Sequence, residues 1–268
     1  MIRIDHVTWR IDGHSLADDI DLTIRDGEIT VLIGPNGAGK SSLIHLASGA
    51  VRPTTGHILI DGMPIGSFAP ARLAQRRAVL SQRQTGGEGF TVAELVRLGL
   101  KLTLGRPSAA SSRALVEDAL AEVDLQGWRN RLIGTLSGGE RQRAHLARVL
   151  VQLRAGAESR RRGALFLDEP IAAQDPAQQL RVLDVARAHA SAGGAVLLVL
   201  HDLNWAARVA DRIVALKRGR VVADGPAKAV LTRTMLADLF EIDLNPGAVP
   251  SDRPFVLPQM VSPLSPID

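Results

Sequence analysis

The 268-residue sequence has no cysteine and no tyrosine, and aromatic residues make up only 3% of it. The lack of cysteine excludes disulfides and thiolate metal sites. The shortage of aromatic rings leaves few platforms on which nucleic-acid bases could stack. No apolar run approaches the ~18 residues that a membrane span needs, and Arg3, Asp5 and Arg10 interrupt any signal-peptide core. We therefore expect a soluble, cytoplasmic chain that reaches a membrane only through a partner.

The overall charge is weakly positive. The net charge is +4, and nearly all of the basic residues are arginines. A balance of this size fits an anion-binding enzyme as well as a membrane-surface protein, and it is weak evidence for a nucleic-acid partner. Apolar residues make up 46% of the chain, which is enough for a substantial core. The length fits one large α/β domain or a domain with a subdomain.

The segment Gly34–Ser41 reads GPNGAGKS and matches G-x-x-x-x-G-K-[ST] without a mismatch. An apolar run that indicates a strand, Ile29–Ile33, precedes it, and an expected helix follows, which is the context that a phosphate-binding loop requires. Its N–H groups, the Lys40 ammonium and the Ser41 hydroxyl suit a polyphosphate with Mg²⁺. An ordinary glycine-rich turn does not require that lysine and serine. The residues expected to contact the nucleotide are Gly34, Pro35, Asn36, Gly37, Ala38, Gly39, Lys40, Ser41 and Ser42.

Two further segments carry groups suited to phosphate chemistry. An apolar strand within Ala164–Pro170 ends in Asp168 and Glu169, which suit an Mg²⁺ carboxylate and a group that polarises the attacking water. Taken alone, this pair also fits a solvated acidic turn. The segment Leu136–Glu140, LSGGE, begins a helix with a second anion-binding N-terminus, or simply a good cap. One nucleotide can use both phosphate elements only if the chain folds back or two chains meet.

The periodicity of apolar residues changes to a helical one at Thr91, where Thr91 and Glu94 form a capping-box pattern. We expect a helical insertion with a linker at Pro107–Ser112 and a helix at Ser112–Val123, whose apolar face comprises Leu115, Ala119, Leu120 and Val123. Six prolines after residue 244 predict an extended or partly ordered tail. The expected divisions are residues 1–90 for the first part of the core, 91–135 for the helical subdomain, 136–240 for the second part of the core and 241–268 for the tail.

Five motifs in this order resemble the ATP-binding subunits of ABC transporters. They are the phosphate loop Gly34–Ser41, Gln82, the sequence LSGGE at Leu136–Glu140, Asp168–Pro170 and His201. The resemblance implies an α/β fold, with a P-loop NTPase core of ABC type, an antiparallel β subdomain and an inserted helical subdomain. It also implies ATP and Mg²⁺ as ligands. Each ATP would lie in a head-to-tail homodimer, against the signature residues Ser137, Gly138, Gly139 and Glu140 of the second chain.

The same resemblance assigns roles to single residues. It makes Glu169 the general base, His201 a contact of the γ-phosphate, and Gln82 a sensor of Mg²⁺ and water; Ser41, Gln82 and Asp168 would be the Mg²⁺ residues. Alternatively, Gln82 is a surface residue and His201 caps the helix that follows it.

Two positions depart from the family pattern. Gln174 replaces an apolar residue, which makes communication across the dimer less certain at this point. The usual adenine-stacking tyrosine is absent, so Trp9 is the candidate, although the spacing places Arg10 or Ile11 there and Trp9 also suits a core or edge position.

Within the family, the segments Arg76–Gln82, Phe90–Gly99 and His201–Ile213 resemble importers for iron chelates, cobalamin and haem. Two segments favour the haem importers: the stretch Gln152–Gly163, which is longer than is typical of the family, and the tail segment Arg253–Pro258. The expectation is an energy-coupling ATPase at the cytoplasmic face of the inner membrane, peripheral to it. A homodimer would dock on two permease subunits that a periplasmic substrate-binding protein supplies, with no nucleic acid and no direct haem contact. The alternatives are an importer of ferric siderophores or cobalamin, a soluble non-transport ATPase, or a regulator without turnover.

Overall fold

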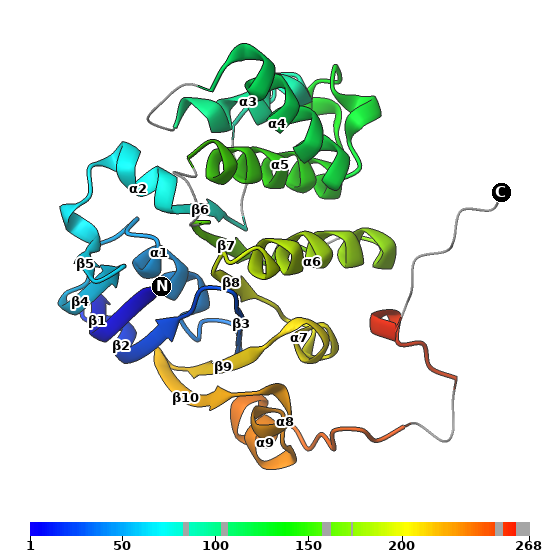
Figure 1. Cartoon of the computed structure of the whole chain (residues 1–268). Helices are drawn as coiled ribbons and strands as arrows, with labels where there is room; N and C mark the ends of the chain where they lie inside the picture. Colours follow the sequence, from blue (N-terminus) through cyan, green and yellow to red (C-terminus); the bar gives the residue numbers. More distant parts are fainter. Residues whose placement is uncertain (83–85, 103–106, 157–161, 173, 250–253, 261–268) are drawn as a thin grey trace.

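The computed structural model describes residues 1–82, 86–102, 107–156, 162–172, 174–249 and 254–260. A six-stranded sheet with the order β10-β9-β3-β8-β7-β6 forms the centre of this part of the chain (Figure 1). Strands β9, β3, β8, β7 and β6 are parallel to one another, and β10 pairs antiparallel with β9 at the edge. The bounds are β3 Ile29–Ile33, β6 Arg77–Leu80, β7 Ala164–Asp168, β8 Val196–Val199, β9 Arg212–Lys217 and β10 Arg220–Gly225.

The central strands are covered on both faces, which explains why they read as unbroken apolar runs rather than alternating ones. Every residue of β3, β7 and β8 is buried. Along β3, Val31 faces a core shared with the long helices, and its neighbour Leu32 faces a core shared with the antiparallel sheet. This two-sided burial fixes the register of the sheet.

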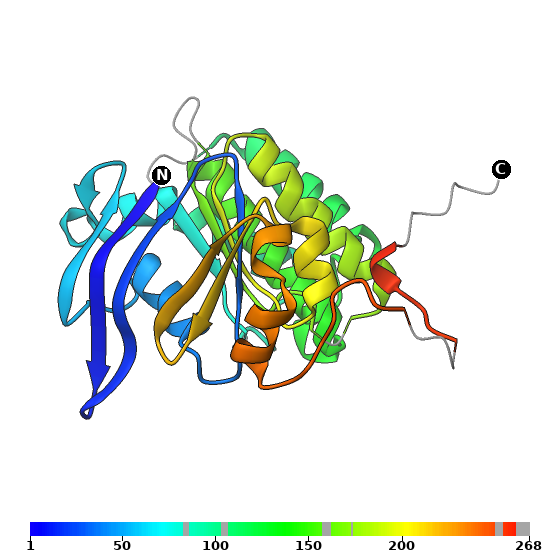
Figure 2. The same cartoon turned by 90° about the horizontal axis from the view of Figure 1, so that it is seen from below.

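A second, antiparallel sheet has the order β2-β1-β4-β5. Helix α1, Lys40–Ala47, packs between it and the central sheet, with contacts to β2, β7 and β8. In Figure 2 this antiparallel sheet lies to the left and the long helices lie on the opposite side of the central sheet. The bounds are β1 Ile2–Ile11, β2 His14–Ile24, β4 Thr55–Ile60 and β5 Met63–Pro64. The phosphate loop therefore lies where the two sheets meet.

Helices α3, α4 and α5 gather at one end of the molecule, while α6 and α7 cover the central sheet (Figure 1). Their buried residues join those of β3, β7 and β8 in a continuous core. Within the described residues, no helix has the length and apolar character needed to cross a membrane. The remaining bounds are α2 Pro70–Arg76, α3 Val92–Lys101, α4 Ala109–Glu122, α5 Gly138–Gly156, α6 Pro176–Ser191, α7 Leu203–Val209, α8 Ala227–Val230, α9 Arg233–Phe240, and the 3₁₀ turns η1 Ile65–Ser67, η2 Gln126–Trp128, η3 Ile133–Thr135 and η4 Pro258–Met260.

The structure tests several of the local expectations. The capping box at Thr91 and Glu94 is confirmed. The expected linker at Pro107–Ser112 is wrong, because α4 begins at Ala109, where the Ser108 side chain accepts a hydrogen bond from the backbone N–H of Ser111 and caps the helix. The buried face expected for that helix is confirmed at Ala119, Leu120 and Val123 but not at Leu115.

On α4, Val116 is buried, and Leu115 is only partly so. Helix α5 continues through Gly156, and residues 157–161, within the long stretch Gln152–Gly163, lie outside the described residues. The tail is partly ordered where it is described, since η4 forms within it; its prolines 250, 263 and 266 lie outside the described residues. The boundaries of the four expected divisions stay predictions.

Helix α3 lies unusually close to α5 at Gly99. A Cβ atom at this position would lie 2.4 Å from the Arg148 carbonyl oxygen and 2.9 Å from the Gln152 backbone nitrogen. Both neighbours are helical backbone and cannot move aside as a flexible side chain would. The absence of a side chain at Gly99 therefore sets the distance between the two helices.

We predict that Gly99→Ala lowers the free energy of unfolding by about 1–3 kcal/mol, because the added methyl group must separate α3 from α5. The control is Gly127→Ala, since nothing lies within 4 Å of a Cβ atom built on Gly127. Urea unfolding followed by circular dichroism measures both variants. A Gly99→Ala protein as stable as the wild type would contradict the close approach.

The side chain of His145 is buried in the middle of α5. Neither of its ring nitrogens has a hydrogen-bond partner among the described residues. Burial, with the nearby positive charges of Arg148 and Arg141, lowers the pKa of His145 from 6.5 to about 4. The folded protein therefore keeps this ring neutral at a pH where the unfolded chain already binds a proton.

We predict that His145 makes the protein less stable as the pH falls from about 6.5 to 4. In this window the unfolded state binds more protons than the folded state, so the free energy of unfolding decreases by on the order of 3 kcal/mol through this group. Urea unfolding across this range should show a smaller decrease in His145→Leu than in the wild type. The exposed His57→Leu variant should follow the wild type. Parallel curves for His145→Leu and the wild type would refute the assignment.

Candidate nucleotide site

The phosphate loop between β3 and α1 is held tightly by the backbone around it. Gly34 has a φ of 148°, and a Cβ atom there would lie 2.2 Å from the Leu216 carbonyl oxygen. Gly39 has a φ of 100°, and a Cβ atom there would lie 2.5 Å from the Leu16 carbonyl oxygen. The backbone N–H of Gly219 donates to the Ala38 carbonyl at 2.9 Å. At Gly34 and Gly39, glycine is therefore required both by φ and by space.

Lys40 begins α1 and is only 6% exposed. Its ammonium donates to the carbonyl oxygens of Gly34 at 2.8 Å and Pro35 at 2.9 Å, so it lies across the inside of the loop. Burial lowers the pKa of Lys40, and the carboxylates of Glu169 and Asp168 act in the opposite direction. An ammonium has three N–H donors, so one remains for an anion that enters the loop.

Asp168 ends β7 beside the phosphate loop and is 4% exposed. Burial raises its pKa, and a hydrogen bond with the Ser41 side chain acts against this shift. Its Oδ1 atom is buried without a hydrogen-bond partner among the described residues. A buried carboxylate oxygen without a partner, next to a hydroxyl, fits the oxygen ligands that Mg²⁺ requires. The residues present therefore fit the expected metal.

Glu169 contacts two other predicted site residues. Its Oε2 atom accepts a hydrogen bond from Gln82 Nε2 at 2.7 Å, and its Oε1 atom lies 2.5 Å from His201 Nε2. Gln82 follows β6, Glu169 follows β7 and His201 follows β8, so three separate strand ends bring these side chains together. Each carboxylate oxygen of Glu169 has one partner and keeps a second lone pair, so Glu169 can still accept a hydrogen bond from water.

The backbone of Glu169 has a φ of 51°, in the left-handed region that non-glycine residues rarely adopt. Gln142, on α5, donates from Nε2 to the Glu169 carbonyl oxygen at 2.8 Å. Gln174 donates to Gln142 Oε1 at 3.2 Å and to the Pro170 carbonyl at 2.9 Å. Within one chain, the unusual Gln174 thus supports the turn that carries Glu169. Communication across a dimer at this position stays a prediction.

Gln142 is a site residue that sequence reasoning missed. It stands on α5 and is 9% exposed. Such a buried amide needs a hydrogen-bond partner, but the sequence alone does not identify a carbonyl 27 residues away.

The signature segment forms a reciprocal cap at the start of α5. The Ser137 backbone N–H donates to Glu140 Oε2 at 2.7 Å, and the Glu140 backbone N–H lies 3.4 Å from Ser137 Oγ. A recess of about 440 Å³ lies beside it, bordered also by Trp128 and Asp175. No residue of the phosphate loop is among the residues lining this recess. A single chain therefore does not combine the two phosphate elements in this recess.

Trp9 lies on β1, partly buried and packed against the core between the two sheets. This placement is the core or edge position that was the alternative to adenine stacking. Its contact with a nucleotide base stays a prediction.

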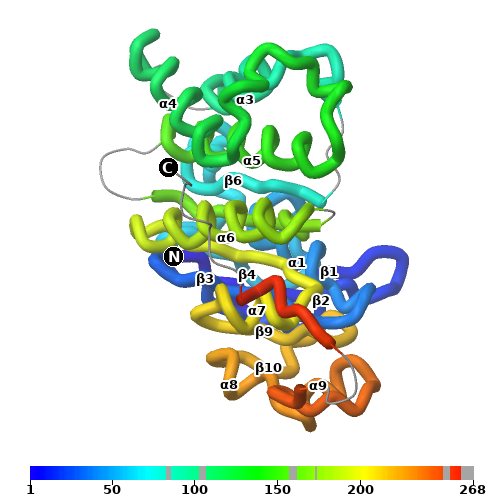
Figure 3. Tube along the Cα trace, turned by 90° about the vertical axis from the view of Figure 1, so that its right-hand side faces the viewer, coloured from blue at the N-terminus to red at the C-terminus, as the bar shows by residue number. Residues whose placement is uncertain are grey.

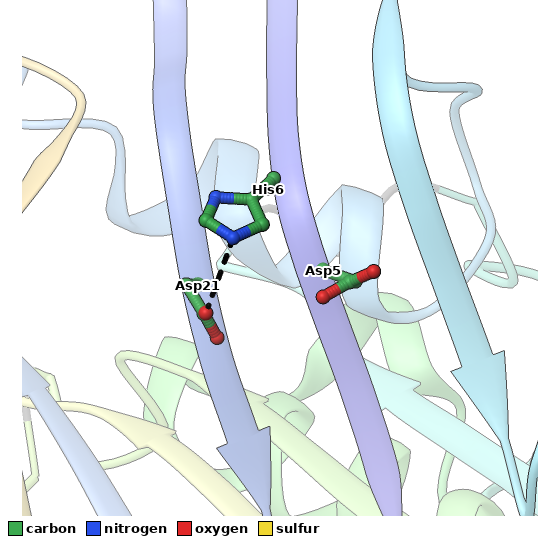
Figure 4. Close-up of side chains that lie close together, drawn as sticks. All are labelled: Asp5, His6 and Asp21. Carbon is green, nitrogen blue, oxygen red and sulfur yellow. Dashed lines mark ion pairs between the residues drawn. The ribbon is translucent and has the colours of Figure 1, made fainter.

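Asp5, His6 and Asp21 form a second cluster of titratable groups, on β1 and β2 (Figure 4). His6 Nε2 lies 3.7 Å from Asp21 Oδ2. Arg3 pairs with Asp5 at 3.2 Å and also with Asp21. These carboxylates already have cationic partners, so the cluster is a surface ion-pair network, separate from the phosphate loop.

Comparisons with known proteins agree with this geometry. Residues 17–172 match the sequence model of the ABC transporter family. The hemin import ATP-binding protein HmuV of Rhodopseudomonas palustris is 43% identical, covering 97% of this chain and 95% of that protein. HmuV of Bradyrhizobium diazoefficiens is 45% identical over the same shares of the two chains. The solved structure of an ATP-binding subunit of an ABC transporter aligns with a TM-score of 0.76 at 24% identity, covering 92% of this chain and 95% of that one, and shows the same fold.

The expected α/β fold, with its parallel core, antiparallel sheet and helices, is thereby confirmed. More than half of the sequence lies within the family model and nearly all of it aligns with the two relatives, so the chain belongs to the ABC transporter family.

Proposed function

We propose that this chain is the ATP-hydrolysing, energy-coupling subunit of an ABC importer for haem. The observation that carries the ATPase assignment is the contact of Gln82 and His201 with Glu169, next to the loop that holds Lys40. The haem assignment draws its support from the relatives of nearly equal length whose names specify hemin import. ATPase subunits of ferric siderophore or cobalamin importers would use the same chemistry, so a growth test must distinguish the substrates.

In the proposed mechanism, positioning and electrostatics provide most of the catalysis. The loop N–H groups and the Lys40 ammonium bind the β- and γ-phosphates. Ser41, Asp168 and Gln82 would hold Mg²⁺, which neutralises phosphate charge when bound. Glu169 accepts a proton from the attacking water, and the His201 ring, placed beside Glu169, contacts the γ-phosphate.

A second copy of the chain would supply Ser137, Gly138, Gly139 and Glu140 to each nucleotide. The recess beside these residues has no lining from the phosphate loop of its own chain, which supports a head-to-tail homodimer. We propose that this dimer docks on two permease subunits at the cytoplasmic face of the inner membrane. A periplasmic binding protein would deliver haem to the permease, without direct contact between haem and this chain.

We predict that Glu169→Gln lowers the rate of ATP hydrolysis about 100-fold or more while ATP binding is retained, because an amide of nearly the same shape cannot accept the proton. Glu241→Gln is the matched control, since Glu241 is exposed and also has a left-handed backbone, with a φ of 59°. Phosphate release and calorimetric ATP titration measure the two properties. A Glu169→Gln protein with the wild-type rate would remove Glu169 from the role of base.

A growth test identifies the substrate. We expect that deleting the gene abolishes growth when haem is the only iron source but leaves the use of ferric siderophores and cobalamin unchanged. The wild-type gene and Lys228→Ala should restore growth on haem, because Lys228 is exposed. Lys40→Ala should not restore it, because the loop loses its buried ammonium.

A defect on a siderophore or cobalamin would instead keep the ATPase mechanism and change the substrate. Unimpaired growth on all three would contradict the importer function.

A further inference from the structure

The segment 254–260 contains one buried polar residue, Gln259. Its exposed fraction is 8%, whereas those of Val256 and Met260 are 84% and 77%. This residue lies in η4, which contacts α6 and α7. In Figure 3 the red segment lies across α7. The tail thus touches the body of the protein through a polar side chain rather than through its apolar ones.

Gln259 contacts both ends of α7, at its N-cap Asp202 and at Arg208 in its last turn. Its Nε2 donates to Asp202 Oδ2 at 2.6 Å, and its carbonyl oxygen accepts a hydrogen bond from Arg208. The other carboxylate oxygen of Asp202 accepts the backbone N–H groups of Asn204 at 2.8 Å and Trp205 at 3.1 Å. One carboxylate therefore caps α7 and binds the tail at the same time.

Asp202 directly follows His201, whose ring is bonded to Glu169. The orientation of the Asp202 cap determines where α7 begins, and so fixes the backbone from which the His201 ring projects. The amide oxygen of Gln259 is buried without a partner among the described residues, which costs free energy. The charge-assisted bond to Asp202 offsets this cost and explains why an amide is buried here.

A second path leads from the tail to the turn after Glu169. The guanidinium of Arg208 lies 5.5 Å from the centre of the Trp205 ring. Trp205 Nε1 donates to Gln179 Oε1 at 2.8 Å, and Gln179 Nε2 lies 3.4 Å from the Ile171 carbonyl oxygen. The tail is thus connected to both sides of the contact between His201 and Glu169.

We propose that Gln259 is a positioning residue for ATP hydrolysis, which holds Asp202 and thereby fixes the start of α7 and the place of the His201 ring beside Glu169. This role lies in the C-terminal tail, well beyond the residues 17–172 that match the family model. It rests on the proposed ATPase function. It implies that the tail supports the hydrolytic site of its own chain.

The test uses three substitutions in the full-length protein. Gln259→Ala removes the donor and should lower kcat about tenfold with little change in KM for ATP. Gln259→Glu should lower kcat further, because two carboxylates then repel each other. Gln259→Lys keeps a donor for Asp202 and should restore at least half of the wild-type kcat. Met260→Ala is the control, because it changes an exposed side chain in the same turn.

A second readout follows the ring of His201 by ¹⁵N NMR, without nucleotide. Its resonances are assigned by their loss in His201→Asn. They should shift in Gln259→Ala and Gln259→Glu, and should stay at the wild-type position in Gln259→Lys and Met260→Ala. Thermal unfolding of each variant separates loss of position from loss of stability.

A Gln259→Ala protein with a lower melting temperature but wild-type kcat and His201 resonances would overturn the proposal, because the tail would then be an anchor alone. If the wild type does not hydrolyse ATP, or Glu169→Gln is equally active, the proposed function fails instead. The His201 resonances then still decide whether Gln259 positions the ring.

Discussion

The parallel pairing of neighbouring strands is the constraint on which the whole site depends. Strands β6, β7, β8 and β3 lie side by side in this order, so their carboxyl ends meet at one edge of the sheet. Asp168 forms one of these ends, and Gln82, His201 and the phosphate loop each follow another. Residues far apart in the sequence therefore meet at this edge, and the side chains of their strands need not contact one another. The same rule governs ligand sites in open α/β sheets generally.

Charge compensation is the second property of this edge. The buried Lys40 ammonium lies near two carboxylates, Asp168 and Glu169, which favour its charged form. Lys40, Asp168 and Glu169 together carry no net positive charge that could balance the several negative charges of a nucleotide. The unpaired oxygen of Asp168 is thus the point at which a divalent cation would balance the site. Burial makes each of these interactions stronger than it would be in water.

The sequence was sufficient to predict the strands, the phosphate loop and the residues that converge on Glu169, because each follows a buried apolar run or belongs to an ordered motif. It was not sufficient for Gln142, Gln174 or Gln259. Their partners are backbone carbonyls or side chains in distant segments, and a local sequence pattern does not indicate such contacts. The start of α4 is different, since a proline followed by Ser108 is a local capping signal that the linker interpretation overlooked.

The length of α5 has a mechanical consequence. Its 19 residues make a rod about 28 Å long. The close approach at Gly99 joins α3 to its middle, and the signature residues stand at its first turn. A rotation of this rod by about 5° moves one end relative to the other by about 2–3 Å. That displacement exceeds the tolerance of a hydrogen bond, so a small tilt is enough to make or break a hydrogen bond at Ser137.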